Sequence, residues 1–192
     1  NMLTQMQAAR QGIITETMRI VAAKENLPAE TIRAGVAEGT IAICANPNHK
    51  SLSPSGVGKG LSTKVNANIG TSSSYPDPQP ELLKLAAAIE AGADAVIDLS
   101  TGDNIEASRK AIIEASTVMV GTVPIYQATV EAIKKHGAVV DMTKEDLFAV
   151  IEQQAKDGAD FMTIHCGINR NVLKALLAEG RVMDVVSRGG SF

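Results

Sequence analysis

Between residues 63 and 187, short apolar runs rich in β-branched residues alternate with longer stretches of helical periodicity. The runs predict strands at 63–69, 94–99, 118–122, 160–165 and 183–187, and the stretches between them predict helices at 80–91, 104–115, 127–137, 143–157 and 170–179. Thr143, followed by Asp146 three residues later, predicts a cap at the start of the helix at 143–157. The alternation of strands and helices is typical of βα units that build a parallel sheet. The predicted fold class is therefore α/β, with about five successive βα units.

Two segments of the chain repeat the same joint between a helix and a strand. AIEAGADAVIDLS at 88–100 and QAKDGADFMTIHC at 154–166 each contain a helix end, Gly-Ala-Asp, and a strand that finishes in polar residues. Glycine fits the left-handed cap after a helix, and a repeated joint indicates one structural unit used more than once. The pattern favours a (β/α)8 TIM-type barrel. Because that fold takes roughly 250 residues, we expect only its first part here, in a chain that looks truncated.

The first 62 residues do not follow this rhythm. Residues 4–27 and 29–40 have helical patterns, whereas residues 41–62 are rich in glycine and serine and predict a loop. We therefore expect an N-terminal helical and loop extension at 1–62, packed on the first part of a catalytic barrel at 63–192. SPSGVGKG at 53–60 superficially resembles a phosphate loop, but it lacks the required spacing and a clear preceding strand, which favours a flexible loop.

Composition narrows the classes of partner. The 18 basic and 21 acidic residues are well mixed and give a net charge of -3, with no basic stripe for nucleic acid and no polybasic membrane patch. No apolar run approaches the roughly 20 residues of a membrane span. Two cysteines, Cys44 and Cys166, cannot build a disulfide framework, so a reducing, cytoplasmic setting is expected.

Polar side chains stand at or just past the end of each predicted strand. They are Asn66 and Asn68, Asp98 with Ser100 and Thr101, Thr122 with Tyr126, His165 with Cys166, and Ser187 with Arg188. In a (β/α) barrel, the C-terminal ends of the strands form the face that carries active sites. Any one of these residues could instead hydrogen-bond its own turn, but five such ends in a row favour a site.

Three of these groups allow more than one interpretation. The stretch VSRGGSF at 186–192 could bind a phosphate through backbone N–H groups, a hydroxyl and an arginine, or could be an ordinary glycine turn. Asp98 could act as a base or could anchor the turn at Ser100. His165 could hydrogen-bond a ligand, act as an acid or base, or be a structural histidine.

The His165-Cys166 pair does not predict a metal or thiol site. Neighbouring side chains on a strand point to opposite faces, so a thiolate-imidazole pair is not expected. Zinc would need further ligands, and His49 and His136 show no metal-ligand spacing. Cys166 is most simply a small buried or turn residue.

Seven motifs in order carry a resemblance to a known family: TQMQAARQGIIT, ANPNHKS, KVNANIGTSS, DLSTG, GTVPIYQA, DFMTIHCG and VSRGGS. Together they resemble phosphomethylpyrimidine synthases, the thiamine-pyrimidine synthases of the radical S-adenosylmethionine class, from about Thr4 to Phe192. The resemblance implies a radical rearrangement of 5-aminoimidazole ribonucleotide to hydroxymethylpyrimidine phosphate. It also implies S-adenosylmethionine, a [4Fe–4S] cluster and zinc as cofactors, and a homodimer.

Carried over residue by residue, the resemblance implies a substrate site on the polar strand ends. The residues that match the family's substrate positions are Asn68, Ile97, Tyr126 and His165, with Ser187, Arg188 and Gly189 around the substrate phosphate. No catalytic residue is assigned. The zinc ligands and the cluster cysteines are expected outside this chain, so the chain alone should be inactive.

Two departures from the family pattern keep other functions open. Ile97 stands where the family has methionine, and Cys166 replaces a small residue. A paralogue, 5-hydroxybenzimidazole synthase of anaerobic cobamide biosynthesis, uses the same substrate and is therefore an alternative. Two further alternatives are a non-catalytic half-barrel, whose exposed sheet edges would need a partner, and a zinc hydrolase that uses His49 and His165.

Overall fold

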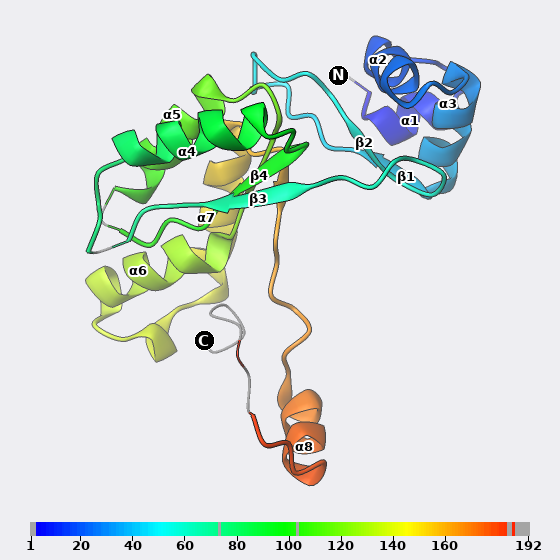
Figure 1. The fold of residues 1–192 in the computed structure, drawn as a ribbon. Coiled ribbons are helices and arrows are strands. Elements are labelled where there is room, and N and C mark those ends of the chain that lie inside the picture. The colour runs from blue at the N-terminus through cyan, green and yellow to red at the C-terminus, as the bar shows by residue number, and fades with distance from the viewer. Residues whose placement is uncertain (1–2, 73, 103, 184–185, 187–192) are drawn as a thin grey trace.

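A computed structural model describes residues 3–72, 74–102, 104–183 and 186. Three short helices come first, namely α1 (Gln5–Arg10), α2 (Glu16–Glu25) and α3 (Ala29–Glu38). An antiparallel pair of strands follows, β1 (Ile41–Ile43) with β2 (Gly56–Gly58). Figure 1 shows this group of elements at one end of the molecule, beside the larger sheet.

The larger sheet is parallel, and its strands lie side by side in chain order. They are β3 (Asn66–Ile69), β4 (Ala95–Asp98), β5 (Met119–Thr122) and β6 (Phe161–Met162). The connections contain α4 (Gln79–Glu90), α5 (Ile105–Ala115), α6 (Pro124–His136), the 3-10 turn η1 (Val139–Asp141) and α7 (Lys144–Asp157). After β6 comes one more helix, α8 (Arg170–Ala178). This confirms the predicted α/β class with a parallel sheet. Within the described residues the sheet is open, with β3 and β6 at its edges.

One face of the sheet is covered by helices. Ile69, Val96 and Val120 come from three adjacent strands and pack in one buried cluster with Leu85 of α4 and Ile112 of α5. Because side chains alternate along a strand, these residues all point to the same side of the sheet. This cluster fixes α4 and α5 against the strands.

The other face carries a row of four residues that are paired across the sheet. In it, Asn68 of β3 pairs with Ile97 of β4, Ile97 with Gly121 of β5, and Gly121 with Phe161 of β6. We call these four residues the interior row. Each lies one residue before the end of its strand, and Phe161 also begins the two-residue β6.

A buried polar network joins α5, α6 and α7. Arg109 of α5 is 1% exposed; its Nη1 donates to Gln127 Oε1 of α6 at 2.7 Å, and its guanidinium pairs with Asp157 of α7. Gln154 of α7 donates to the same Gln127 oxygen at 3.0 Å. The buried charge is thus paired and hydrogen-bonded, which holds the three helices in one layer.

The N-terminal elements have a hydrophobic cluster of their own. Its buried members include Met18 and Val21 of α2, Ile32 and Val36 of α3, and Ile41 of β1. The division of the chain into 1–62 and 63–192 nevertheless stays a prediction. Within the described residues, no helix is both long and apolar enough to cross a membrane.

The structure corrects two expectations for these elements. The helical pattern at 4–27 forms two helices, because Gly12 turns the chain with φ of 77° and Thr15 caps the start of α2. Residues 41–62 were expected to be a loop but contain β1 and β2. A Cβ at Gly58 would lie 2.7 Å from Ile41 Cα, so this glycine allows the two strands to approach.

The later elements agree with the predictions in most places. The capping box expected at Thr143 and Asp146 is present at the start of α7. The strand expected at 160–165 is correct only for Phe161–Met162, because the last sheet hydrogen bond runs from Thr163 N–H to Thr122 O at the end of β5. Of the strand expected at 183–187, Met183 lies in a bend, and residues 184–185 and 187 lie outside the described residues.

The carboxylate of Asp160, just before β6, joins segments that are far apart in the sequence. Its Oδ2 accepts from Val120 N–H of β5 at 2.8 Å and from the His49 ring Nδ1 at 2.6 Å, and its Oδ1 accepts from Asn46 N–H at 2.8 Å. The second ring nitrogen of His49 lies 2.9 Å from Ser116 O. Since both partners of the ring are acceptors, this geometry favours the form of His49 in which both ring nitrogens donate, the imidazolium ion.

Other residues of the motif ANPNHKS, at 45–51, also contact the segments that Asp160 joins. Asn46 Nδ2 donates to Ala155 O and Ala159 O, at 2.7 Å and 2.9 Å, near the end of α7. Ser51 Oγ donates to Ser116 O at 2.7 Å, just past the end of α5. The motif therefore satisfies carbonyls at two helix ends.

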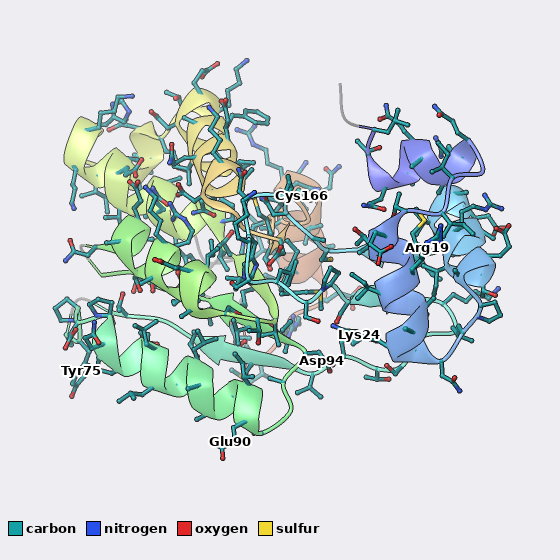
Figure 2. All side chains as sticks on the ribbon, turned by 90° about the horizontal axis from the view of Figure 1, so that it is seen from above. Arg19, Lys24, Tyr75, Glu90, Asp94 and Cys166 are labelled. Carbon is teal, nitrogen blue, oxygen red and sulfur yellow. The ribbon has the colours of Figure 1, made fainter. Side chains whose placement is uncertain are left out.

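A second set of contacts joins α2 to the sheet. Lys64 lies just before β3 and pairs with Glu25 of α2 at 2.7 Å, with side chains only 10% and 7% exposed. Lys24 Nζ donates to Ser53 O at 2.9 Å. Figure 2 shows Lys24 near Asp94, whose carboxylate accepts from Val65 N–H beside β3.

We predict that Asp160→Asn destabilises the fold by about 3–5 kcal/mol, the usual cost of breaking a buried ion pair. The substitution leaves the His49 imidazolium without its counter-ion, although it keeps one oxygen acceptor for the backbone donors. Urea unfolding of both proteins measures the difference. Asp141→Asn on the exposed η1 turn is the control and should change the free energy of unfolding by less than about 0.5 kcal/mol; equal effects would contradict the anchoring role.

We also predict that the stabilisation from His49 declines with rising pH. Burial alone lowers the pKa of His49, but the bonds to Asp160 and to the Ser116 carbonyl outweigh it and raise that pKa above its ordinary value. The stabilisation is therefore complete below the unfolded-state pKa of about 6.5 and is lost as the pH rises through the folded-state pKa.

Unfolding of wild type and His49→Gln from about pH 5.5 to about pH 8.5, the range in which histidine titrates, tests this dependence. The gap in unfolding free energy between the two proteins should narrow as the pH rises. Lys50→Gln, at the exposed neighbouring position, should show a constant gap. A His49→Gln gap that widens with pH would refute the ion pair.

Candidate functional site

Two residues of the expected site lie together in the interior row. Asn68 is exposed at the end of β3, and its Oδ1 accepts from Asn66 Nδ2 at 3.3 Å. Ile97 of β4 is directly paired with Asn68 and is 9% exposed. The asparagine therefore offers an amide beside an apolar neighbour on the face of the sheet that α4 and α5 leave open.

Tyr126 and His165 extend this group along the C-terminal ends of the strands. Tyr126 lies in the first turn of α6, directly after β5, and shares a buried cluster with Ile97 and Val123. The ring centroids of Tyr126 and His165 are 6.4 Å apart. The pairing of β3 with β4, the buried cluster and the contact between the two rings thus connect Asn68, Ile97, Tyr126 and His165 in one continuous set.

His165 is half-buried and has a ring nitrogen available for a ligand. Its Nδ1 is buried and has no hydrogen-bond partner among the described residues. Buried polar atoms are normally hydrogen-bonded, so an unpartnered nitrogen beside Tyr126 suits a polar atom of a ligand. The expectation that His165 and Cys166 occupy opposite faces of a strand is wrong, because β6 ends at Met162 and Cys166 N–H turns back to Ile164 O at 3.1 Å.

The expected phosphate-binding residues cannot be placed beside this group. Ser187, Arg188 and Gly189 lie outside the described residues. Their role in phosphate binding stays a prediction from the sequence. The described site is consequently the part formed by Asn68, Ile97, Tyr126 and His165.

Asp98 belongs to the opposite face of the sheet. It is 5% exposed, accepts from Ser100 N–H at 2.9 Å and also accepts from the Ser100 hydroxyl. Ser100 Oγ in turn accepts from Thr71 N–H at 3.0 Å, which joins the ends of β3 and β4. Of the two readings of Asp98, the turn anchor is therefore the one that its contacts support.

The contact between the ends of β3 and β4 also requires a glycine. Gly70 has φ of 147°, and a Cβ on it would lie 2.6 Å from Ser100 N. The chain after β3 thus passes directly against the chain after β4. This contact holds the ends of both strands, and with them Asn68 and Ile97, at a constant separation.

The described residues do not fit a metal or an iron-sulfur cluster. No group of three or more His, Cys, Asp or Glu side chains within them could hold a metal ion. Cys44 is partly buried, and burial together with the Asp160 charge raises the pKa of its thiol, while Cys166 lies in the exposed segment before α8 (Figure 2). A [4Fe–4S] cluster takes cysteine thiolates as ligands, and these two are the only cysteines in the chain.

His49 is likewise unsuited to zinc. Its side chain is 0% exposed, and both ring nitrogens are engaged by Asp160 and Ser116. A metal ligand needs a nitrogen lone pair, which an imidazolium lacks. The alternative of a zinc hydrolase built on His49 and His165 is thereby contradicted.

Sequence reasoning overlooked two residues that shape this region. Phe161 lies in the interior row and packs against the cluster of Ile97, Val123 and Tyr126. Alternate residues share a face of a strand, so the sequence placed Phe161 on the same face of the expected strand as Thr163 and His165. Nothing in the sequence showed that Phe161 would lie beside Gly121. Asp160 was also missed, because its partner His49 is 111 positions away.

Comparisons with known proteins agree on one family. A model described as the Radical SAM ThiC family matches residues 4–192. The chain is 58% identical over 190 residues to a phosphomethylpyrimidine synthase of Thermoanaerobacter sp. (strain X514). The aligned region covers 99% of this chain and 44% of that protein. It is 53% identical over 190 residues to 5-hydroxybenzimidazole synthase BzaB of Moorella thermoacetica, covering 99% of this chain and 45% of that protein. The chain thus spans less than half the length of these relatives.

We predict that Asp98→Asn leaves the fold as stable as wild type at neutral pH, or stabilises it. Burial, the largest effect, raises the pKa of Asp98 despite the bonds from Ser100 and the charge of Arg109. The folded state therefore favours the protonated acid, and the charged form costs stability once the pH exceeds the unfolded-state pKa.

Asparagine keeps an oxygen acceptor for Ser100 and removes this buried charge. Asp98→Ala is the matched variant, and it should destabilise the fold by about 1–3 kcal/mol because Ser100 loses its acceptor. Thermal and urea unfolding measure both. An Asn variant as unstable as the Ala variant would show that the negative charge itself holds the turn.

Proposed function

Because the chain belongs to the Radical SAM ThiC family, we propose that it is the N-terminal part of a phosphomethylpyrimidine synthase that rearranges 5-aminoimidazole ribonucleotide to hydroxymethylpyrimidine phosphate. The observation that carries the proposal is the convergence of Asn68, Ile97, Tyr126 and His165 at the C-terminal ends of adjacent strands. In this proposal the four residues bind the substrate, and Ser187, Arg188 and Gly189 hold its phosphate.

The roles of these residues follow from their chemistry. Asn68 presents both a donor and an acceptor, which suits the amino group and ring nitrogen of the aminoimidazole. His165 Nδ1 is buried without a partner among the described residues and would bind a polar atom of the same ligand. Ile97 and Tyr126 exclude water from the side of the heterocycle.

We propose that the open sheet is the first part of a (β/α)8 barrel. The strands are parallel and in chain order, which is the order of a barrel. The relatives are more than twice as long as this chain, which leaves room for further βα units between the edges β6 and β3. Such units would pair both exposed edges and enclose the interior row.

The family implies S-adenosylmethionine and an iron-sulfur cluster, which would together supply the radical. We propose that the cluster ligands, and any zinc ligands, belong to the part of the relatives that this chain does not span, because Cys44 and Cys166 do not fit that role. The chain's own contribution is to bind and orient the substrate. A cytoplasmic homodimer is proposed on the family resemblance alone.

A second candidate is the synthesis of 5-hydroxybenzimidazole from the same substrate. The specific observations in its favour are the 53% identity to BzaB of Moorella thermoacetica and Ile97 at a position where the pyrimidine-forming family has methionine. A non-catalytic half-barrel would instead bind the ribonucleotide without converting it. Analysis of the product separates all three.

We predict that a full-length chimera, in which residues 4–192 replace the matching segment of the Thermoanaerobacter relative, forms hydroxymethylpyrimidine phosphate. The assay contains 5-aminoimidazole ribonucleotide, S-adenosylmethionine, a reconstituted cluster and a reductant, and mass spectrometry identifies the product. Asn68→Ala and His165→Ala should each weaken substrate binding by about tenfold or more, the loss expected when a buried hydrogen bond is removed.

Asn171→Ala, on exposed α8, is the matched control and should leave binding unchanged. The Thermoanaerobacter enzyme itself shows that the assay works. Formation of 5-hydroxybenzimidazole would favour the second candidate. Binding without any product would favour the half-barrel, and full binding in both Asn68→Ala and His165→Ala would refute the proposed site.

A further inference from the structure

The ring of Phe161 lies across β5 in the space above Gly121. A Cβ built on Gly121 would lie 2.8 Å from Phe161 Cδ2 and would overlap Cε2 and Cζ. Real Cβ atoms do not approach other atoms so closely, so any side chain at this position would displace the ring. Glycine at 121 is thus a condition for the observed position of Phe161.

The ring is only partly buried in this position. Phe161 packs against the cluster of Ile97, Val123 and Tyr126, with some of its surface open. It belongs to the interior row, on the face that α4 and α5 leave open. Asn68 lies at the other end of the same row, and His165 follows four residues later in the chain.

Resting on the proposed function, we propose that Phe161 is a further substrate-contacting residue, whose ring forms an apolar floor for the aminoimidazole ring of the ribonucleotide. Planar rings pack favourably against aromatic side chains in stacked or edge-on arrangements. Ile97 and Tyr126 complete this floor, which we define as Ile97, Tyr126 and Phe161. Gly121 sets the depth of the floor, because it lets the ring lie close to the strand.

The geometry also explains how the floor would work with the polar groups. Asn68 and His165 offer hydrogen bonds at its sides, which can orient the heterocycle only if its height above the sheet is defined. Phe161 defines that height. A smaller side chain would leave space under the ligand, and a displaced ring would push the ligand away from Asn68 and His165.

The test uses the same full-length chimera and measures binding of 5-aminoimidazole ribonucleotide by calorimetry, together with KM, kcat and the thermal unfolding midpoint. Phe161→Leu should raise Kd and KM about tenfold, as expected for the loss of an aromatic contact with a ligand ring. Phe161→Tyr keeps the ring and should bind within about twofold of the unmodified chimera. Met162→Leu, on the opposite face of the same strand, should change stability alone.

Gly121→Ala probes the depth of the floor. It should weaken binding because the methyl group displaces the Phe161 ring, and the double variant Gly121→Ala/Phe161→Leu should bind more tightly than Gly121→Ala alone. Stability is measured in parallel, so that a change in Kd at an unchanged fraction of folded protein is assigned to the ligand contact.

The outcomes separate this inference from the proposed function. A chimera that binds the ribonucleotide while Phe161→Leu binds equally well would overturn the floor alone. A chimera that neither binds nor converts it, beside an active Thermoanaerobacter enzyme, would overturn the proposed function and the floor with it. Should Phe161→Leu fail to fold, Gly121→Ala decides, and its unchanged Kd would refute the inference.

Discussion

The Asp160 carboxylate is the contact on which the arrangement of this chain most depends. It accepts hydrogen bonds from Asn46 and Val120 and pairs with the buried His49 imidazolium. A buried carboxylate is costly unless it is paired and hydrogen-bonded, so this geometry tolerates little displacement of any partner. Because Asp160 stands immediately before β6, its contacts also fix the position of the start of β6, and with it the segment that contains Phe161 and His165.

The anchoring contacts of Asp160 and the candidate site lie at opposite ends of the strands. Asp160 and the motif at 45–51 sit where β6 begins and where α5 and α7 end. Asn68, Tyr126 and His165 sit where β3 and β5 end and beyond β6. In (β/α)8 barrels, the fold that we propose for this sheet, residues at the N-terminal ends of strands serve stability, and those at the C-terminal ends serve chemistry. A motif as distinctive as ANPNHKS is therefore explained here by packing and by hydrogen bonds to helix ends.

The sequence predicted those features that depend on local pattern. β3, β4 and β5 fall within the expected runs, and the cap at Thr143 follows from residues three apart. The failures concern contacts between distant segments. The pattern FMTIH could not show that β6 ends early, because its length is set by where β5 ends at Thr122. β1 and β2 were hidden in a glycine-rich stretch, since Gly58 is needed for the approach of Ile41, 17 positions earlier in the chain. Asn68, Ile97, Tyr126 and His165 came from strand ends and a family resemblance, whereas Phe161 required the structure.

The position of the floor bears on the choice between the two candidate products. In our proposal both candidate reactions start from the same ribonucleotide, so Asn68 and His165, which we propose to hold that ligand by hydrogen bonds, would serve both reactions equally. To favour one product, the protein must interact differently with the transition states that lead from the bound ligand to the two products. Of the two departures from the pyrimidine-forming pattern that the resemblance implies, Ile97 is the one that is paired with Gly121 and lies in the cluster against which Phe161 packs. Isoleucine is branched and stiff where methionine is flexible, so in this proposal it would restrict how the Phe161 ring and a rearranging ligand can move. We therefore propose that the floor, and not the polar groups around it, is the part of this chain that favours one product.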